Sequence, residues 1–531
     1  MEKIGFKNFR RFTELSPLSI GRLTLLSGGN NSGKSTIVKA AMLAINYLKT
    51  PRDNSNTIIN MLQYRKFFFD IDNVHVSSFI RGINNNCDPK SDSIEFSVQL
   101  GVFSIAIEVK SSDSITSSFG YVSNLHIEDT ERGIKYDYIF EGTPSMTIDF
   151  SSVNDEQDEQ KDGIIEEISE EIARLENLTK TSKDLKVISE ANDKLLPLRL
   201  RLALLKGIKD GDRKVFTFPL PPLSDNQNPY FVTQLMASFV GIANTNDLSK
   251  DDEKKNKEAK KYIKSREKDI ALSILSLVDA ISSYKFEYIA AHAASQRAFY
   301  TIYDQSDYTA QTVHGFFNSG VAKSDIDDCI WIKANEIDNI SVPEKLLLKY
   351  LKLFGIGSGI CVKSINNESY TVDIIDEYSK TMPLADKGMG AIQLTILLLR
   401  ITLLLKKYEF TSHKPIILVE EPEQNLHPRT QSLLADFFYE ISTSYKFQIL
   451  VETHSEYFVR KMQVIFASQV KEQNQTEEEL NDIIKVYFFP EDNTPYLMTF
   501  LKNGRFENTF GPGFFDEAGR WNRELNKLER Q

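Results

Sequence analysis

The stretch Gly28-Gly29-Asn30-Asn31-Ser32-Gly33-Lys34-Ser35-Thr36 matches the pattern GxxxxGK[ST] and decides how the rest of the chain is interpreted. The apolar run at 23–26 before it predicts a buried strand, and the composition of 36–47 after it predicts a helix. In this strand–loop–helix context the pattern is typical of a phosphate-binding loop. The alternative is a glycine-rich surface turn.

The parts of this loop have roles that follow from their chemistry. Its glycines let backbone amides curl around phosphate oxygens, and the start of the following helix adds its positive dipole. Lys34 is expected to bridge the β- and γ-phosphates, and Ser35 is expected to bind Mg²⁺. The predicted site for ATP and Mg²⁺ comprises Gly28, Asn30, Asn31, Ser32, Gly33, Lys34, Ser35 and Thr36.

A second apolar strand, at 416–419, is predicted far along the chain and runs directly into Glu420-Glu421-Pro422-Glu423. A buried strand that delivers acids at its carboxyl end is how P-loop proteins present a Mg²⁺ ligand beside the phosphates. Because side chains alternate along a strand, Glu420 and Glu421 are expected to point in opposite directions. One can then serve the metal while the other polarises water. A solvated acidic turn is the alternative.

A third apolar strand is predicted at 447–451 and is followed by Glu452-Thr453-His454-Ser455. A neutral histidine at this strand end can donate a hydrogen bond to a γ-phosphate oxygen or to the attacking water. A purely structural histidine is the alternative. His454 is therefore a candidate catalytic residue, together with Lys34 and Glu421.

A glycine-rich turn, Leu384-Ala385-Asp386-Lys387-Gly388-Met389-Gly390-Ala391-Ile392-Gln393, opens a long apolar helix predicted at 392–406. Gly388 and Gly390 expose backbone amides at the start of this helix, which makes a second anion site. One nucleotide needs only one phosphate-binding loop. We therefore expect this turn to close over the nucleotide that is bound to another subunit. An ordinary glycine-containing helix start is the alternative.

Composition excludes several classes of protein. The 531 residues suggest about three domains, and a net charge of −11 excludes a simple basic DNA-coating protein. Three scattered cysteines exclude a disulfide scaffold or a zinc ribbon and fit a reducing cytoplasm. The N-terminal segment lacks the features of a signal peptide. The longest apolar stretch, 392–405, is interrupted by Gln393 and Arg400, and we expect it to be too short to cross a bilayer.

The pattern along the chain predicts an α/β protein with three parts. Residues 1–154 are expected to form an N-terminal ATPase lobe, with the P-loop and a β-meander at 92–150. Residues 155–281 are expected to form a helical insertion that serves as a partner or dimer platform. It has an acidic stretch, Asp155 to Glu176, with an apolar stripe, and a basic run, Lys250 to Lys268. Residues 282–531 are expected to form a C-terminal ATPase lobe.

The motifs and the insertion, in this order, resemble an ABC/SMC-type AAA family ATPase of the overcoming-lysogenization-defect-like class. The opening NFRRF is similar to the first strand of those proteins, which implies that Arg10 or Arg11 lies near the nucleotide. Four segments, 288–317, 384–400, 419–438 and 451–463, are most similar to the ATPase subunit of the Septu antiphage system, which is also found as a retron effector.

This resemblance implies a fold and a set of roles. The fold would be an ABC/SMC-like P-loop ATPase head, a mixed β-sheet with helices, carrying a helical insertion. Glu420 would take the metal position with Ser35, Glu421 would be the hydrolytic carboxylate, and His454 would be the switch histidine. The trans-acting signature would be Asp386, Lys387, Gly388, Gly390 and Gln393. Two departures are a glutamate at 420, where aspartate is commoner, and Lys387 in place of a serine, so that a cation can meet the partner's γ-phosphate.

The resemblance also implies a function. The chain would be the ATPase subunit of a cytoplasmic antiphage complex, acting as a homodimer or higher oligomer without a membrane. It would control a separate HNH nuclease subunit, joined in the retron version by a reverse transcriptase with its RNA–DNA hybrid. We expect no nuclease in this chain, because no spaced Glu and DxD set follows His454 and the DxD at 325–327 precedes the signature. The alternatives are a stand-alone SMC-like DNA-repair or DNA-bridging ATPase and, less favoured, a nuclease-bearing relative.

Overall fold

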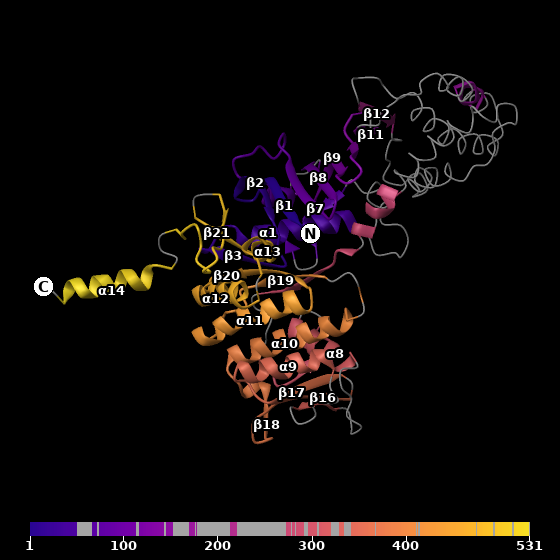
Figure 1. The fold of residues 1–531 in the computed structure, drawn as a ribbon. Helices are drawn as coiled ribbons and strands as arrows, with labels where there is room; N and C mark the ends of the chain where they lie inside the picture. The colour runs from indigo at the N-terminus through magenta and orange to yellow at the C-terminus, as the bar shows by residue number, and fades with distance from the viewer. Residues whose placement is uncertain are drawn as a thin grey trace. The chain divides into compact units, whose positions relative to one another are not determined.

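The structure is a computed structural model that describes residues 1–49, 66–151, 169–177, 213–219 and 272–529, with short gaps inside these ranges. It is an α/β protein, as predicted (Figure 1). The described residues form two compact units. The first comprises residues 1–18 and 39–283, and the second comprises residues 19–38 and 284–531.

The first unit is built on an antiparallel nine-stranded sheet with the order β12-β11-β10-β9-β8-β7-β1-β2, in which β4 also pairs with β9. Apolar side chains alternate along β7 and β8, so that one face of the sheet is buried. The meander predicted at 92–150 is therefore confirmed. The elements are β1 (Lys3–Phe9), β2 (Phe12–Ser19), β4 (Lys66–Phe68), β5 (Asp70–Ile71), β6 (Val74–His75), α3 (Phe79–Gly82), β7 (Ile94–Leu100), β8 (Phe103–Ser111), β9 (Phe119–Asp129), β10 (Ile134–Ile139), β11 (Ser145–Ser151) and β12 (Arg213–Pro219).

Strand β12 lies within the range predicted as a helical insertion. It pairs along its whole length with β11, and its sequence RKVFTFP contains valine, threonine and two phenylalanines, residue types that are common in strands. The helical prediction holds at 169–175, where Ile172 and Leu175 of the expected stripe are buried. The helix predicted at 195–206 and the basic run 250–268 lie outside the described residues, as does the DxD at 325–327.

The second unit is built on a six-stranded sheet with the order β13-β19-β20-β3-β21-β22, parallel except for β22. The P-loop strand β3 lies between β20 and β21, so its hydrogen-bonding partners come from the far end of the chain. The strands are β3 (Leu23–Gly28), β13 (Phe286–Ile289), β19 (Ile416–Glu420), β20 (Gln448–Thr453), β21 (Ile484–Phe489) and β22 (Tyr496–Leu497).

A five-stranded antiparallel sheet completes this unit, and helices α8 to α11 lie between the two sheets (Figure 1). Its strands are β14 (Tyr300–Thr301), β15 (Cys329–Lys333), β16 (Gly359–Ile365), β17 (Ser369–Ile375) and β18 (Thr381–Pro383). The helices that begin in this unit are α1 (Lys34–Lys49), α8 (Tyr308–Asn318), α9 (Val342–Leu353), α10 (Met389–Lys407), α11 (Pro428–Ser444), α12 (Glu456–Glu472), α13 (Glu477–Ile483) and α14 (Glu517–Leu528).

Helix α10 is longer than the sequence predicted. With 19 residues it is long and apolar enough to cross a membrane by composition alone, so the expectation of a stretch that is too short was wrong. In the structure 61% of its apolar window is buried, and it packs against α8 and α9. Its interrupting Arg400 is paired with Glu287 at 2.9 Å. The helix therefore belongs to the core of this unit.

The boundaries between the three predicted domains stay a prediction, and the structure adds one observation to them. Residues 19–38, which hold the P-loop, are grouped with residues 284–531 rather than with the rest of the N-terminal part. The reason is the position of β3 inside the parallel sheet.

Candidate active site

The P-loop is shaped by backbone conformations that restrict which residues it can contain. Gly28 ends the fully buried strand β3 with φ +150°, and a Cβ atom there would lie 2.3 Å from the Phe489 carbonyl oxygen. Asn31 and Gly33 also have positive φ angles, which curl the chain before α1 begins at Lys34. Asn30 and Asn31 are exposed at the tip, whereas Ser32 and Thr36 are buried. The loop has the form that the motif predicts.

The ammonium group of Lys34 lies inside this loop, and the side chain is only 2% exposed. Its Nζ donates to the carbonyl oxygen of Gly29 at 2.7 Å and to that of Gly28 at 3.3 Å. Burial lowers the pKa of Lys34, while the charge of Glu452 opposes that shift. The cation is thus held within the loop, on the Gly28 and Gly29 carbonyl oxygens, where a phosphate-binding lysine is expected.

Glu452 is a functional-site residue that the sequence interpretation did not single out. Ser35 Oγ donates to Glu452 Oε1 at 3.1 Å, and Lys34 Nζ lies 3.9 Å from the same oxygen. Burial raises the pKa of Glu452 to about 7, although Lys34 and the bond from Ser35 act in the opposite direction. The sequence contained a signal that could have identified Glu452. Side chains alternate along β20, so Glu452, two residues after Leu450, faces the same side of the sheet as Leu450.

Glu420 is the last residue of β19, and its backbone is the register partner of Glu452 on β20. Its carboxylate is hydrogen-bonded to the side chain of Tyr288 on β13. The pKa of Tyr288 is raised, chiefly by burial and then by this bond. Glu420 therefore lies beside Glu452 at the carboxyl edge of the sheet, and its predicted metal role stays a prediction.

Glu421 does not continue the strand, so the expectation that strand alternation would orient it was wrong. Its φ of +43° turns the chain away, and its backbone amide donates to the Glu452 carbonyl oxygen at 2.8 Å. Its carboxylate accepts a hydrogen bond from Gln424 and lies 3.7 Å from His454 Nε2. A local turn, rather than the pleat, brings Glu421 to the histidine.

His454 lies at the end of β20, between the P-loop and Glu421. Its side chain is hydrogen-bonded to the backbone of Gly28. Burial lowers the pKa of His454, and the charge of Lys34 lowers it further. The neutral imidazole is therefore favoured, as the predicted hydrogen-bonding role requires.

A second unpredicted carboxylate, Glu423, supports this turn. Its Oε1 accepts a 2.6 Å hydrogen bond from the His454 amide, and the side chain is 7% exposed. Burial raises the pKa of Glu423. The sequence pattern contained Glu423 as the third acid after β19, but nothing in the pattern indicated its partner.

The signature turn contacts the loop that follows Glu421 within the same chain. Gln393 Nε2 is 3.5 Å from the Pro422 carbonyl oxygen, and Lys387 Nζ is 3.4 Å from that of Ile356. A Cβ atom at Gly390 would lie 2.7 Å from the Asn425 carbonyl oxygen. Gly390 is therefore required by packing inside the subunit, which differs from the predicted reason, close approach of a phosphate.

Gly388 differs from Gly390 in its surroundings. It is the exposed N-cap residue of α10, and no described atom lies within 4 Å of a Cβ placed there. Asp386, just before it, is also exposed. Asp386 and Gly388 are therefore accessible to a second chain.

Arg10 and Arg11 belong to the first unit, at the turn between β1 and β2. Arg10 has a φ of +53°, and its amide donates to the Gly82 carbonyl oxygen at 2.6 Å. The Arg11 guanidinium lies over the Phe12 ring at 5.7 Å. Their assignment to the nucleotide stays a prediction.

The residues at the edge of the sheet fit a magnesium ion. Carboxylate and hydroxyl oxygens are the ligands that Mg²⁺ prefers, and Glu452, Glu420 and Ser35 supply them. Ligand atoms of Glu421, Glu452 and His454 all lie within 4.8 Å of one another. Glu452 Oε2 is buried and has no hydrogen-bond partner among the described residues. An excess of carboxylates around Lys34 favours a bound cation.

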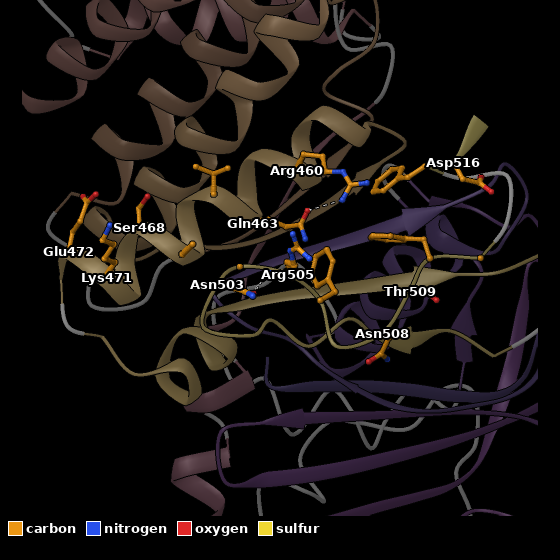
Figure 2. Close-up of a pocket in the computed structure, with 17 residues that line it drawn as sticks. Arg460, Gln463, Ser468, Lys471, Glu472, Asn503, Arg505, Asn508, Thr509 and Asp516 are labelled. Atoms are coloured by element: carbon orange, nitrogen blue, oxygen red, sulfur yellow. Dashed lines mark hydrogen bonds between the residues drawn. The ribbon is translucent and has the colours of Figure 1, made fainter. Parts of the chain in front are cut away.

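A larger groove, of about 960 Å³, lies elsewhere in the second unit, between α12 and residues 503–516 (Figure 2). Arg460 donates to Gln463 at 3.2 Å there, and its guanidinium lies 5.2 Å from the centre of the Phe515 ring. None of the predicted site residues lines this groove. The candidate site at the sheet edge is therefore separate from this groove.

Comparisons with known proteins identify the family to which the chain is similar. The model of the AAA ATPase domain family matches residues 1–459. No curated protein matches the chain. Similar solved structures include an SMC head domain from Thermotoga maritima, with 10% identity and a TM-score of 0.30, covering 94% of this chain and 98% of that chain. Another is the Smc head domain with an extended coiled coil, bound to the C-terminal domain of ScpA, from Pyrococcus furiosus, with 10% identity, a TM-score of 0.25 and 99% coverage of both chains.

The predicted fold class is confirmed. The parallel sheet with its P-loop strand, the antiparallel sheet and the helices form an α/β P-loop ATPase fold, in agreement with the match to the AAA ATPase domain.

Proposed function

The chain belongs to the AAA ATPase domain family, and from this premise we propose that it is the ATPase subunit of a bacterial antiphage defence complex, Septu-like or retron-associated. In this proposal it binds and hydrolyses ATP as a dimer and controls a separate HNH-type nuclease. The observation that carries the ATPase part is the cluster of Lys34, Ser35 and Glu452 beside Glu421 and His454. The resemblance of segments 384–400, 419–438 and 451–463 supports the choice of complex.

Binding of ATP uses groups that are already in place. The Lys34 ammonium exchanges its bonds to the Gly28 and Gly29 carbonyl oxygens for phosphate oxygens, which are stronger acceptors. The amides between Gly28 and Lys34 and the start of α1 add their positive ends. The buried position of Lys34 strengthens this attraction, because little water screens it.

Hydrolysis breaks the bond between the γ-phosphorus and its bridging oxygen while a water oxygen bonds to that phosphorus. Glu421 accepts the proton that this water releases. His454, kept neutral by burial and by Lys34, donates a hydrogen bond to the charge that develops on the phosphoryl group. A magnesium ion, when bound, offsets the phosphate charge.

The dimer forms when the signature of one subunit closes over the nucleotide of the other. Gly388 and Asp386 are the exposed part of that turn. The backbone amides around Gly388 lie at the start of α10 and bind the γ-phosphate held by the partner subunit. Each site then needs two chains.

Residues 155–281 supply the platform for the nuclease partner in this proposal. The acidic stretch 155–176 repels nucleic acid and attracts a basic protein, whereas the basic run 250–268 contacts nucleic acid. Converting the acidic side chains at 155–162 to amides should release the partner. Converting the same number of lysines at 254–261 to glutamine is the matched control and should leave partner binding intact. Equal binding by both variants would remove the acidic stretch from the proposal.

Co-purification from the native operon tests the whole function. We expect a tightly bound nuclease subunit, identified by mass analysis, and ATP turnover that duplex DNA does not change. Turnover that rises with duplex DNA, without any associated nuclease, would instead support a stand-alone DNA-bridging ATPase.

A further inference from the structure

Two neighbouring strands of the second unit end in carboxylates at the same level of the sheet. Glu420 on β19 and Glu452 on β20 are register partners, and β20 is the strand that lies directly beside the P-loop strand β3. Within β20 and β3, Glu452 is the register partner of Leu26, two residues before Gly28. Position in the sheet therefore brings Glu452 closer to the loop than Glu420.

The side-chain contacts of the two carboxylates also place Glu452 at the P-loop and Glu420 away from it. Glu452 Oε1 accepts the Ser35 hydroxyl at 3.1 Å and lies 3.9 Å from Lys34 Nζ, so it touches both chemically active side chains of the loop. Glu420 is instead hydrogen-bonded to Tyr288 on the strand farther from the P-loop. Only Glu452 is in contact with the serine whose hydroxyl binds metal in this motif.

The second carboxylate oxygen of Glu452, Oε2, is suited to bind a cation. Oε2 is buried and has no hydrogen-bond partner among the described residues, and the whole side chain is 5% exposed. A buried carboxylate oxygen without a hydrogen-bond partner is unfavourable, because it has lost its contact with water and has gained nothing in return. A cation beside Ser35 removes that cost.

We propose that Glu452, rather than Glu420, is the carboxylate that holds the magnesium ion together with Ser35. This inference rests on the proposed ATPase function and changes its metal site. Without nucleotide, Glu452 orients the Ser35 hydroxyl and neutralises Lys34. With nucleotide, Lys34 turns to the phosphates and leaves the Glu452 oxygens for the cation. Glu420 then acts as a positioning residue, which anchors the end of β19 through Tyr288.

The test compares Glu452→Gln with Glu420→Gln, which is the matched control at the same register level. Mn²⁺ is titrated into each full-length protein with a non-hydrolysable ATP analogue, and the free ion is followed by electron paramagnetic resonance. We expect Glu452→Gln to weaken Mn²⁺ binding by about tenfold or more, as loss of a group at a metal centre does. Glu420→Gln should change it by less than about threefold. Glu452→Asp, which keeps the charge, should recover part of the binding.

The opposite ranking, with Mn²⁺ affinity lost in Glu420→Gln and kept in Glu452→Gln, would overturn the proposal. Thermal melting and analogue affinity in EDTA show whether a variant is folded. If Glu452→Gln is unfolded, the Mn²⁺ affinities of Glu452→Asp and Glu420→Gln are compared instead. The proposal then predicts that Glu452→Asp changes the Mn²⁺ affinity and that Glu420→Gln does not. Failure of the proposed ATPase function would give a different result, because the ATP analogue would then bind wild type and Lys34→Ala with equal affinity. That result would also overturn this inference.

Discussion

The backbone amide of His454 donates a 2.6 Å hydrogen bond to the carboxylate of Glu423, which joins the turn after β20 to the turn after β19. The same two turns carry His454 and Glu421, whose side chains lie 3.7 Å apart. A buried carboxylate thus fixes the distance between the two residues that we assign to hydrolysis.

We expect Glu423→Ala to slow ATP turnover and to destabilise the protein by about 1–3 kcal/mol, because the His454 amide loses its buried acceptor. Glu423→Gln keeps an acceptor oxygen and is the matched control, with near-normal turnover. Urea unfolding and steady-state turnover measure the two effects. Equal activity of the alanine and glutamine variants would show that this bond does not position the histidine.

Lys34→Ala should weaken ATP binding by about ten- to a hundredfold, the range expected for one buried charged hydrogen-bonding group. The phosphates lose the cation that now lies on the Gly28 and Gly29 carbonyl oxygens. Isothermal titration calorimetry measures the affinity. Unchanged affinity would contradict the assignment of the P-loop.

Glu421→Gln should bind ATP normally, lose about 10²- to 10⁴-fold in turnover and accumulate as an ATP-bound dimer, because only proton acceptance by the carboxylate is removed. Single-turnover kinetics and size-exclusion chromatography report these properties. If Glu420→Gln stops turnover and Glu421→Gln does not, the hydrolytic role belongs to Glu420.

Gly388→Arg tests whether the signature acts on the partner subunit. The position is open within its own chain, so the variant should fold and bind ATP but lose turnover. Mixed with Lys34→Ala, it should regain activity, because one site of the mixed dimer carries both changes and the other carries neither. A mixture that stays inactive despite proven heterodimers would refute the trans-acting role.

Gly390 is a poor position for that experiment. A Cβ atom there would lie 2.7 Å from the Asn425 carbonyl oxygen, so even Gly390→Ala should destabilise the subunit by roughly 1–3 kcal/mol. Thermal melting of the separate variant checks this expectation, with Gly388→Ala as the control that should melt like wild type.

The stability of the first unit should depend on pH through His126. Its hydrogen bond to Asp137 on the neighbouring strand raises the pKa of His126 above its ordinary value of 6.5. A raised folded-state pKa means that this stabilisation is fully present below 6.5 and is lost as the pH rises through the folded value. The stability difference between wild type and His126→Gln should therefore be larger at about pH 5.5 than at about pH 8.5. Urea unfolding at both values gives the comparison, and a difference that grows with pH would contradict the sign.

The parts of the site that could be predicted are those encoded by neighbouring residues. The P-loop is a contiguous pattern, and its strand and helix follow from local periodicity. Strand β19 and the histidine after β20 were also readable, because apolar runs that end in polar groups are local signals. Glu452 was not, because its role depends on β20 lying directly beside β3, and that pairing joins residues from opposite ends of the chain.

Two further features needed the tertiary structure. The direction of Glu421 is set by a left-handed turn just past β19, whereas the sequence interpretation applied the alternation of the strand to Glu421 as well. The constraint on Gly390 comes from Asn425, which lies far from it in sequence. Edge strand β12 was not predicted because a run of only seven residues lies among segments whose charged sequence we interpreted as helical.

The position of β3 between β20 and β21 has a consequence for synthesis on the ribosome. The P-loop strand is made among the first residues of the chain, yet both of its neighbours in the sheet are translated near the end. Until residue 489 has left the ribosome, a nascent chain therefore carries the phosphate-binding loop without the complete sheet that supports this loop. A chain that stops before β21 lacks one of the two strands that flank β3, and we expect such a chain not to form the phosphate-binding loop.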